Sequence, residues 1–324
     1  MWNVTRRGAI CLSAIEMEII TDIDKFKALP CAATIGSFDG VHLGHRAVLR
    51  ELRARATEAG LPVMVVTFAR HPRLLFGTCR ERFLLSGNDE KVALLESASV
   101  DYCVMLDFDS AMSAMSAERF MRVVLSERLG VKLLCVGYDH HFGKPKEGEG
   151  FEQYAEYGRA LGMELFMASP FVVDGVAVSS SKVRRALASG DVSCANTLLG
   201  YGYSFTGKVV HGAGIGRSLG FPTANISLAD DMKLLPADGV YAVRLSCDGK
   251  MYKGVMNIGV KPTIGDNLAR TVEVHIIDFA GDIYGKDVTV SLHSRIRGEM
   301  VFESVEALRL RIGSDVEFIK KEMI

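Results

Sequence analysis

The sequence of 324 residues has little excess charge, no long apolar run and a single tryptophan. Its formal net charge is -1, whereas proteins that bind the nucleic-acid backbone are usually basic, so nucleic acid is not an expected partner. No apolar run is long enough to span a bilayer, and we expect no membrane partner. With 48% hydrophobic residues, the chain has the composition of a soluble globular protein, and its length favours two domains.

The seven cysteines lack the spacing of a disulfide framework or a zinc site. Their number is odd and no Cys-x-x-Cys pair occurs. Most lie in apolar runs, such as the one around Cys135, where a reduced and buried thiol is expected. The sequence therefore indicates a cytoplasmic protein.

The first residues contain a weak likeness to a signal peptide. Arg6 and Arg7 precede a short apolar stretch, but that stretch is followed at once by Glu16 and Glu18. We therefore expect residues 1–17 to form an N-terminal extension outside the fold.

Strand and helix patterns alternate along the first half of the chain. Expected strands are 31–38, 62–68, 102–108, 132–137 and 164–169, and expected helices are 45–59, 89–98, 116–129 and 151–162. This alternation predicts a doubly wound α/β domain over residues 18–188, with a parallel sheet covered on both faces. Ligands of such folds bind at the carboxyl ends of the strands.

The pattern changes near residue 189 and becomes rich in strands. Expected strands are 203–211, 240–247, 250–258, 271–279 and 288–295, with glycine and proline between them. A helix is expected over about 304–324, because apolar residues recur on one face. We predict a second domain over residues 189–324, a small β-barrel with a C-terminal helix.

The segment Gly36–His45, GSFDGVHLGH, is the strongest candidate for a ligand site. It follows a buried strand and opens a helix, and a helix N-terminus offers free N–H groups to an anion. Gly36, Gly40 and Gly44 allow close approach of the backbone, and His42 and His45 can face the same phosphate. A metal site or a helix cap with incidental histidines are the alternatives.

These residues carry a family resemblance. The His-x-Gly-His string, with Ser-Ser-Ser-Lys-Val-Arg at 179–184, resembles the nucleotidylyltransferase superfamily. Together with Thr-Phe-Ala-Arg-His-Pro at 67–72 and Gly-Tyr-Asp-His-His-Phe-Gly at 137–143, it resembles the FMN adenylyltransferase module of the bacterial bifunctional riboflavin kinase/FMN adenylyltransferase (FAD synthetase) family. The resemblance extends from about Glu18 to the terminal helix.

The resemblance implies roles for individual residues. It implies that His42 and His45 stabilise charge as FMN attacks the α-phosphorus of ATP, and that Arg184 holds the leaving pyrophosphate. The implied ATP-binding set is Gly36, Phe38, Asp39, Gly40, His42, His45, Ser179, Ser180, Ser181 and Arg184. The implied flavin contacts here are Asp139, His140 and Phe142, although residues 137–143 are also compatible with a plain loop after a strand.

The sequence departs from the family pattern near the flavin. His140-His141 replaces part of a common Phe-Arg pair, and Ala69-Arg70 stands where Glu-Pro is frequent. Ser181 replaces a frequent threonine and keeps its hydroxyl. The first two changes put the flavin contacts in doubt, whereas the phosphate motifs are intact.

A glycine-rich segment at 207–225 ends in Gly-Phe-Pro-Thr-Ala-Asn and lacks the ending of a Walker loop. With Asn257-Ile-Gly-Val-Lys-Pro-Thr and Glu273-Val-His, it resembles riboflavin kinase. The resemblance implies that Thr223 and Asn225 bind Mg²⁺ with ATP, and that Glu273 is the general base for the ribityl hydroxyl. An outward residue on a strand is the alternative for Glu273. Further implied residues are Gly214, Gly220 and Pro222 for ATP and Asn257 and Arg297 for flavin, with a structural role as the alternative for Arg297.

The leading hypothesis is a bifunctional transferase. It would use ATP and Mg²⁺ to convert riboflavin to FMN and FMN to FAD, with pyrophosphate as the second product. Two alternatives remain: a riboflavin kinase with a degenerate adenylyltransferase module, and a flavin-binding regulator without turnover. The oligomeric state is open, with a homo-oligomer as one option.

Overall fold

The structure is a computed structural model that describes residues 17–75, 81–137, 149–212, 214–262 and 268–323. Most of the expected extension at 1–17 lies outside these residues. The chain divides into two compact units. One comprises Met1–Gly36, Leu49–Arg70 and Leu95–Ala168, and the other comprises Ser37–Val48, His71–Leu94 and Ser169–Ile324.

A parallel sheet of six strands forms the core of the first unit, in the order β1-β4-β3-β2-β5-β6. The strands are β1 (Glu18–Ile20), β2 (Cys31–Ile35), β3 (Val63–Phe68), β4 (Tyr102–Leu106), β5 (Val131–Val136) and β6 (Glu164–Met167). Every residue of β2 and β3 is buried, which is typical of strands covered on both faces. The chain proceeds from β2 to β3 and β4 on one side, then crosses to β5 and β6 on the other. The expected α/β fold is confirmed, with its topological switch point between β2 and β5.

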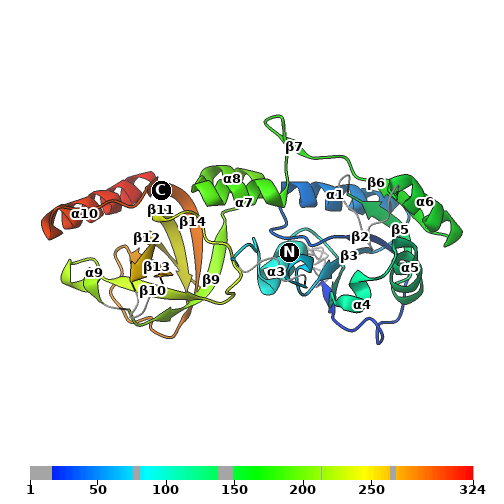
Figure 1. Cartoon of the computed structure of the whole chain (residues 1–324), viewed down its shortest axis with the longest axis horizontal. Helices are drawn as coiled ribbons and strands as arrows, with labels where there is room; N and C mark the ends of the chain where they lie inside the picture. Colours follow the sequence, from blue (N-terminus) through cyan, green and yellow to red (C-terminus); the bar gives the residue numbers. More distant parts are fainter. Residues whose placement is uncertain (1–16, 76–80, 138–148, 213, 263–267, 324) are drawn as a thin grey trace, which may run out of the picture. The chain divides into compact units, whose positions relative to one another are not determined.

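Helices follow most of these strands (Figure 1). They are α1 (Leu43–Glu58), α2 (Pro72–Leu75), α3 (Asn88–Glu96), α4 (Ser110–Ser113), α5 (Ala117–Phe120), η1 (Met121–Arg128) and α6 (Phe151–Ala160). The helix expected over 116–129 is present, but its second part, η1, is a wider π-helix. Phe120 and Leu125 from this segment pack with Ala33 and Ile35 of β2, which covers one face of the sheet.

A closed antiparallel barrel follows, with strand order β10-β13-β12-β11-β14-β9. Its strands are β9 (Ser204–Val210), β10 (Thr223–Leu228), β11 (Gly239–Cys247), β12 (Lys250–Pro262), β13 (Leu268–Ile276) and β14 (Asp287–Arg297). The expected barrel is confirmed. Strand β10 is absent from the expected set, because the glycines before it and Pro222 predict a loop at this point. The structure shows that this segment closes the barrel between β9 and β13.

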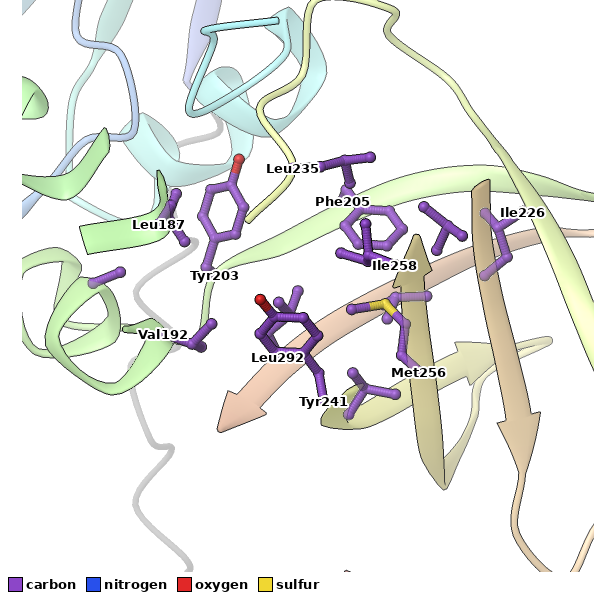
Figure 2. Packing of buried hydrophobic residues seen from close by; sticks show 14 of the residues in the cluster. Leu187, Val192, Tyr203, Phe205, Ile226, Leu235, Tyr241, Met256, Ile258 and Leu292 are labelled. Carbon is purple, nitrogen blue, oxygen red and sulfur yellow. The ribbon is translucent and has the colours of Figure 1, made fainter. Parts of the chain in front are cut away.

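The barrel interior is filled by apolar side chains (Figure 2). Phe205 and Tyr241 are fully buried there with Met256 and Leu292, and Tyr203 is fully buried beside Leu187. The same cluster includes side chains of α7 (Ser180–Ser189) and α8 (Val192–Leu199), the two helices that precede the barrel in the chain. Each buried large side chain contributes roughly 1.5–3 kcal/mol.

Shorter elements complete the structure. They are the hairpin β7 (Val172–Val173) and β8 (Val176–Ala177), the turn helix α9 (Ile215–Ser218) and the terminal helix α10 (Val305–Glu322). Ser304 caps α10 by accepting the Ala307 N–H at 3.1 Å. Val316 and Ile319 of α10 pack on Val240 and Val255, so the helix covers part of the outer face of the barrel.

Candidate active sites

The chain between β2 and α1 forms a tight loop at residues 36–42, which we call the phosphate loop. The Gly36 N–H donates to the Val66 carbonyl at 3.0 Å, which anchors the loop to β3. Phe38 and Val41 have φ values of 47° and 33°, a region that side chains rarely adopt. Both side chains are buried, so the surrounding packing holds this strained backbone in place.

The two histidines of the motif lie against each other at the start of α1. Their rings stack with centroids 3.7 Å apart, and the His45 N–H donates to Nδ1 of His42 at 3.3 Å. Burial lowers the pKa of His42 to about 4, which nearby Asp39 opposes and Arg184 reinforces, so the ring is neutral at pH 7. Because Nδ1 accepts a hydrogen bond, the proton of the neutral ring is on Nε2, which can donate to an anion.

Gly44, between the two histidines, occupies a position where a side chain would not fit. A Cβ on Gly44 would lie 3.0 Å from the Val178 carbonyl oxygen and 3.1 Å from Nδ1 of His42. A side chain at this position would therefore press on the imidazole and on the segment that precedes α7.

Asp39 joins three parts of the chain. Its Oδ1 accepts the backbone N–H groups of Leu85 and Ser86 at 2.9 and 3.0 Å, and its Oδ2 pairs with Nη2 of Arg184. The Ser86 hydroxyl in turn accepts the Gly40 N–H at 2.9 Å. The Asp39 carboxylate is thus bound by protein donors, and it orients Arg184.

The second motif lies at the N-terminus of α7. The Ser180 hydroxyl donates to the Asp39 carbonyl at 3.1 Å, and Nε of Arg184 donates to the Phe83 carbonyl at 2.8 Å. Ser179 occupies the N-cap position and Ser181 is exposed on the first turn. The structure therefore brings the two predicted motifs together at two helix N-termini, an arrangement suited to a polyphosphate.

Two contributors to this cluster, segment 83–86 and Tyr201, are not indicated by the sequence, and a third, His71, belongs to the string at 67–72 but has no role assigned there. The segment 83–86 supplies bonds to Asp39, Gly40 and Arg184 but carries no recognisable motif. The His71 ring lies 5.0 Å from the Phe83 ring, and burial lowers the pKa of His71 to about 4. The Tyr201 hydroxyl donates to the Gly40 carbonyl at 2.6 Å. The flavin contacts expected at Asp139, His140 and Phe142 lie outside the described residues.

The candidate kinase residues form a row on the outer face of the barrel. Asn225 of β10 and Asn257 of β12 each lie directly opposite Glu273 of β13. The Thr223 hydroxyl donates to Oε2 of Glu273 at 3.1 Å. The row therefore places a hydroxyl, two amides and a carboxylate side by side, which is a set of groups able to bind a metal ion and to accept a proton.

Glycines lie at both ends of this row. A Cβ on Gly212 would lie 2.0 Å from the Asn225 amide nitrogen, and a Cβ on Gly259 would lie 2.2 Å from Oε1 of Glu299. Gly214 and Gly220 have φ values of 71° and 83°, which side chains rarely adopt. Gly212 and Gly259 thus let the backbone pass close to Asn225 and Asn257, whereas Gly214 and Gly220 serve the left-handed backbone of the preceding loop.

A small open pocket of about 90 Å³ adjoins Thr223. Arg217, Pro222 and Tyr284 also line it, and the Tyr284 ring stacks on His211 at 3.9 Å.

Arg297 is held by the C-terminal helix. Its Nε and Nη2 donate to Oδ2 of Asp315 at 3.0 and 2.9 Å, and both side chains are largely buried. These partners show a structural contact for Arg297, whereas its predicted contact with flavin remains a prediction.

Fold and sites together define a protein of two modules, an α/β nucleotide-binding type of fold with a phosphate-binding cluster and a β-barrel with a separate polar cluster. Two family models match the chain: FAD synthetase over residues 25–182 and riboflavin kinase over residues 199–323. The bifunctional riboflavin kinase/FMN adenylyltransferase of Pseudomonas fluorescens is 41% identical over 88% of this chain and 91% of its own length. That of Escherichia coli K12 is 39% identical over 92% of this chain and 96% of its own length. The chain belongs to the bifunctional riboflavin kinase/FMN adenylyltransferase family.

A solved structure supports the fold over nearly the whole length. A crystal structure described as a macrolide-efflux protein from Streptococcus pneumoniae matches with a TM-score of 0.85 and 29% identity, covering 95% of this chain and 99% of that one. In the part of the chain that the structure describes, no helix is both long and apolar enough to cross a membrane.

Proposed function

We propose that this chain phosphorylates riboflavin to FMN with ATP and then transfers the adenylyl group of a second ATP to FMN, which gives FAD and pyrophosphate. The observation that carries the proposal is that each family-matched segment contains its own polar cluster. His42 and His45 lie in the FAD synthetase segment, and Glu273 lies in the riboflavin kinase segment. The two clusters share no residue.

In adenylyl transfer, we assign His42, His45 and Arg184 to the phosphates of ATP. Phosphoryl-type transfer depends on positioning and on neutralising charge at the phosphate oxygens. The neutral His42 ring donates from Nε2, and Arg184 supplies the fixed positive charge. The helix starts of α1 and α7 add backbone N–H groups around the same anion.

In the kinase reaction, we assign Glu273 as the base that accepts the proton of the ribityl 5′-hydroxyl. The hydrogen bond from Thr223 orients this carboxylate on the outer face of the barrel. Thr223 and Asn225 offer oxygen donors that fit Mg²⁺, which typically binds few protein ligands and completes its shell with phosphates and water. When bound, Mg²⁺ would neutralise charge on the transferred phosphoryl group.

Domain limits and compartment are part of the proposal. We place the functional boundary at residues 188–189, near the C-terminus of α7, because the two family models leave residues 183–198 between them.

Five cysteines are free in the described part of the chain, and Cys31 and Cys135 are among the buried ones. Free thiols support a reducing compartment such as the cytoplasm.

The test is a flavin assay on the full-length protein. Mg–ATP and riboflavin are supplied, and riboflavin, FMN and FAD are separated by chromatography. We expect both products from the wild type, and FMN without FAD from a His45→Ala variant. Absence of both products from the wild type would overturn the proposal. FMN alone from the wild type would support a kinase with a degenerate first module instead.

A further inference from the structure

Lys233 is a buried lysine in the connection between β10 and β11, and neither predicted motif includes it. Its exposed fraction is 3%, and it lies in the segment matched by the riboflavin kinase model. An isolated buried ammonium group is unfavourable, so its partners indicate what it holds. None of these partners belongs to the kinase row.

The ammonium group of Lys233 has three neighbours. It donates to the Leu85 carbonyl at 2.7 Å and to Oε2 of Glu90 at 2.5 Å, and it lies 4.6 Å from the centre of the Tyr203 ring. Burial lowers the pKa of Lys233, and the negative charge of Glu90 opposes that change. The three neighbours give the ammonium group a fixed position.

The backbone around Lys233 is bonded to the same segment. The N–H groups of Phe83 and Leu84 both donate to the Met232 carbonyl at 2.9 Å, and the Leu234 N–H donates to the Leu84 carbonyl at 2.8 Å. Three backbone hydrogen bonds therefore hold residues 232–234 against residues 83–84. This segment is also the one that binds Asp39, Gly40 and Arg184.

A single peptide group connects Lys233 to the phosphate loop. The carbonyl of Leu85 accepts from Lys233, and the N–H of the same peptide unit, that of Ser86, donates to Oδ1 of Asp39 at 3.0 Å. The peptide group is planar, so fixing its carbonyl also fixes its N–H. A cation at one end and an anion at the other polarise it, which strengthens both bonds.

We propose that Lys233 is a positioning residue for adenylyl transfer: through the Leu85–Ser86 peptide it orients Asp39, and through Asp39 it orients Arg184. A side chain of the kinase segment thus sets the geometry of the other reaction. This inference rests on the proposed function of the first site. A displacement of about 1 Å in such a site can lower the rate by on the order of 100-fold.

The test compares Lys233→Met with Lys250→Met, a matched change at an exposed lysine of the same barrel. Each full-length variant is assayed separately for riboflavin phosphorylation and for adenylylation of supplied FMN. For Lys233→Met we expect kcat/KM for adenylylation to fall on the order of 10- to 100-fold. The loss should appear in kcat and in the KM for ATP, while the KM for FMN and the kinase reaction stay unchanged. Lys250→Met should behave as wild type.

A purely structural role would lower both reactions together, because it would reduce the amount of folded protein. A parallel loss, or no loss in adenylylation, therefore overturns the proposal. Glu90→Gln provides a milder second variant if Lys233→Met does not fold, and it should lower adenylylation alone. If the wild type itself makes no FAD, the proposed function fails; if it does and Glu90→Gln equals wild type, only the role of Lys233 fails.

Discussion

The two candidate sites are assembled in different ways. The phosphate site joins chain segments far apart in sequence through side chains: Asp39 binds Leu85, 46 positions away, and Arg184, 145 positions away. The kinase row is set by backbone pairing, because neighbouring strands place Asn225 and Asn257 opposite Glu273. We infer that single side-chain changes can displace the first site, whereas the second is protected by its ladder of hydrogen bonds.

The largest effect is expected for Glu273→Gln. Loss of a general base lowers a rate by typically 10²- to 10⁴-fold, so riboflavin phosphorylation should fall by about this factor. Adenylylation of supplied FMN should not change, because the barrel backbone is retained. Steady-state assays of both reactions check this, with Glu303→Gln at an exposed position as the control. A variant with full kinase activity would refute the assignment of the base.

The next largest effect is expected for Asp315→Asn, which removes the buried partner of Arg297. Breaking a buried ion pair from one side costs about 3–5 kcal/mol, so the packing of α10 on the barrel should be lost first. Chemical denaturation followed by circular dichroism measures the loss. The matched control is Asp278→Asn, whose pair with Lys320 at 3.0 Å is exposed and should contribute about 0–1 kcal/mol.

Arg297 can be tested in the same experiment. Asp315 also pairs with Arg311 at 3.2 Å, so if the role of Arg297 is structural, Arg297→Met should lose less stability than Asp315→Asn, and the double variant should lose no more than Asp315→Asn alone. A change in the KM for riboflavin without a change in stability would instead favour the predicted flavin contact.

The pH dependence of stability provides a test of the first site. The pKa of His42 falls from 6.5 to about 4 on folding, so the unfolded chain binds more protons in this interval. Its contribution is fully present above pH 6.5 and is lost as the pH falls to about 4. The expected loss is about 3 kcal/mol. Denaturation of wild type and His42→Asn across this range checks it; equal pH slopes would contradict it.

The smallest effect is expected for Tyr201→Phe. It removes the hydrogen bond to the Gly40 carbonyl, which is worth about 1 kcal/mol, so adenylylation should fall by about fivefold. Tyr252→Phe, in the barrel, is the control and should leave adenylylation unchanged. An equal loss in the kinase reaction would show that the bond stabilises the fold and does not specifically position the phosphate loop.

The sequence predicted the periodic parts of this structure better than the contacts between distant segments. Patterns of apolar residues indicated the parallel sheet and most barrel strands. A strand that is buried on one or both faces needs apolar residues at regular positions, and this regularity can be seen within the strand's own sequence. Strand β10 was missed because Pro222 and the glycines before it indicated a loop. The structure brings two predicted motif residues, His45 and Arg184, into one cluster, and their roles stay predictions. Ser86 and Lys233 could not be predicted from the sequence. Their contacts join segments that are far apart in the chain, and local sequence patterns do not show which distant segments pair.

The buried carboxylate of Asp39 makes the opening of the phosphate loop measurable by amide hydrogen exchange. The amide hydrogens of Leu85 and Ser86 both bond to this buried group, so each can exchange with solvent only when the loop opens. Their exchange rates therefore report the free energy of opening the phosphate loop, residue by residue and without substrate. Comparison with amides inside the barrel ladder would give the local stability of each site on a common scale.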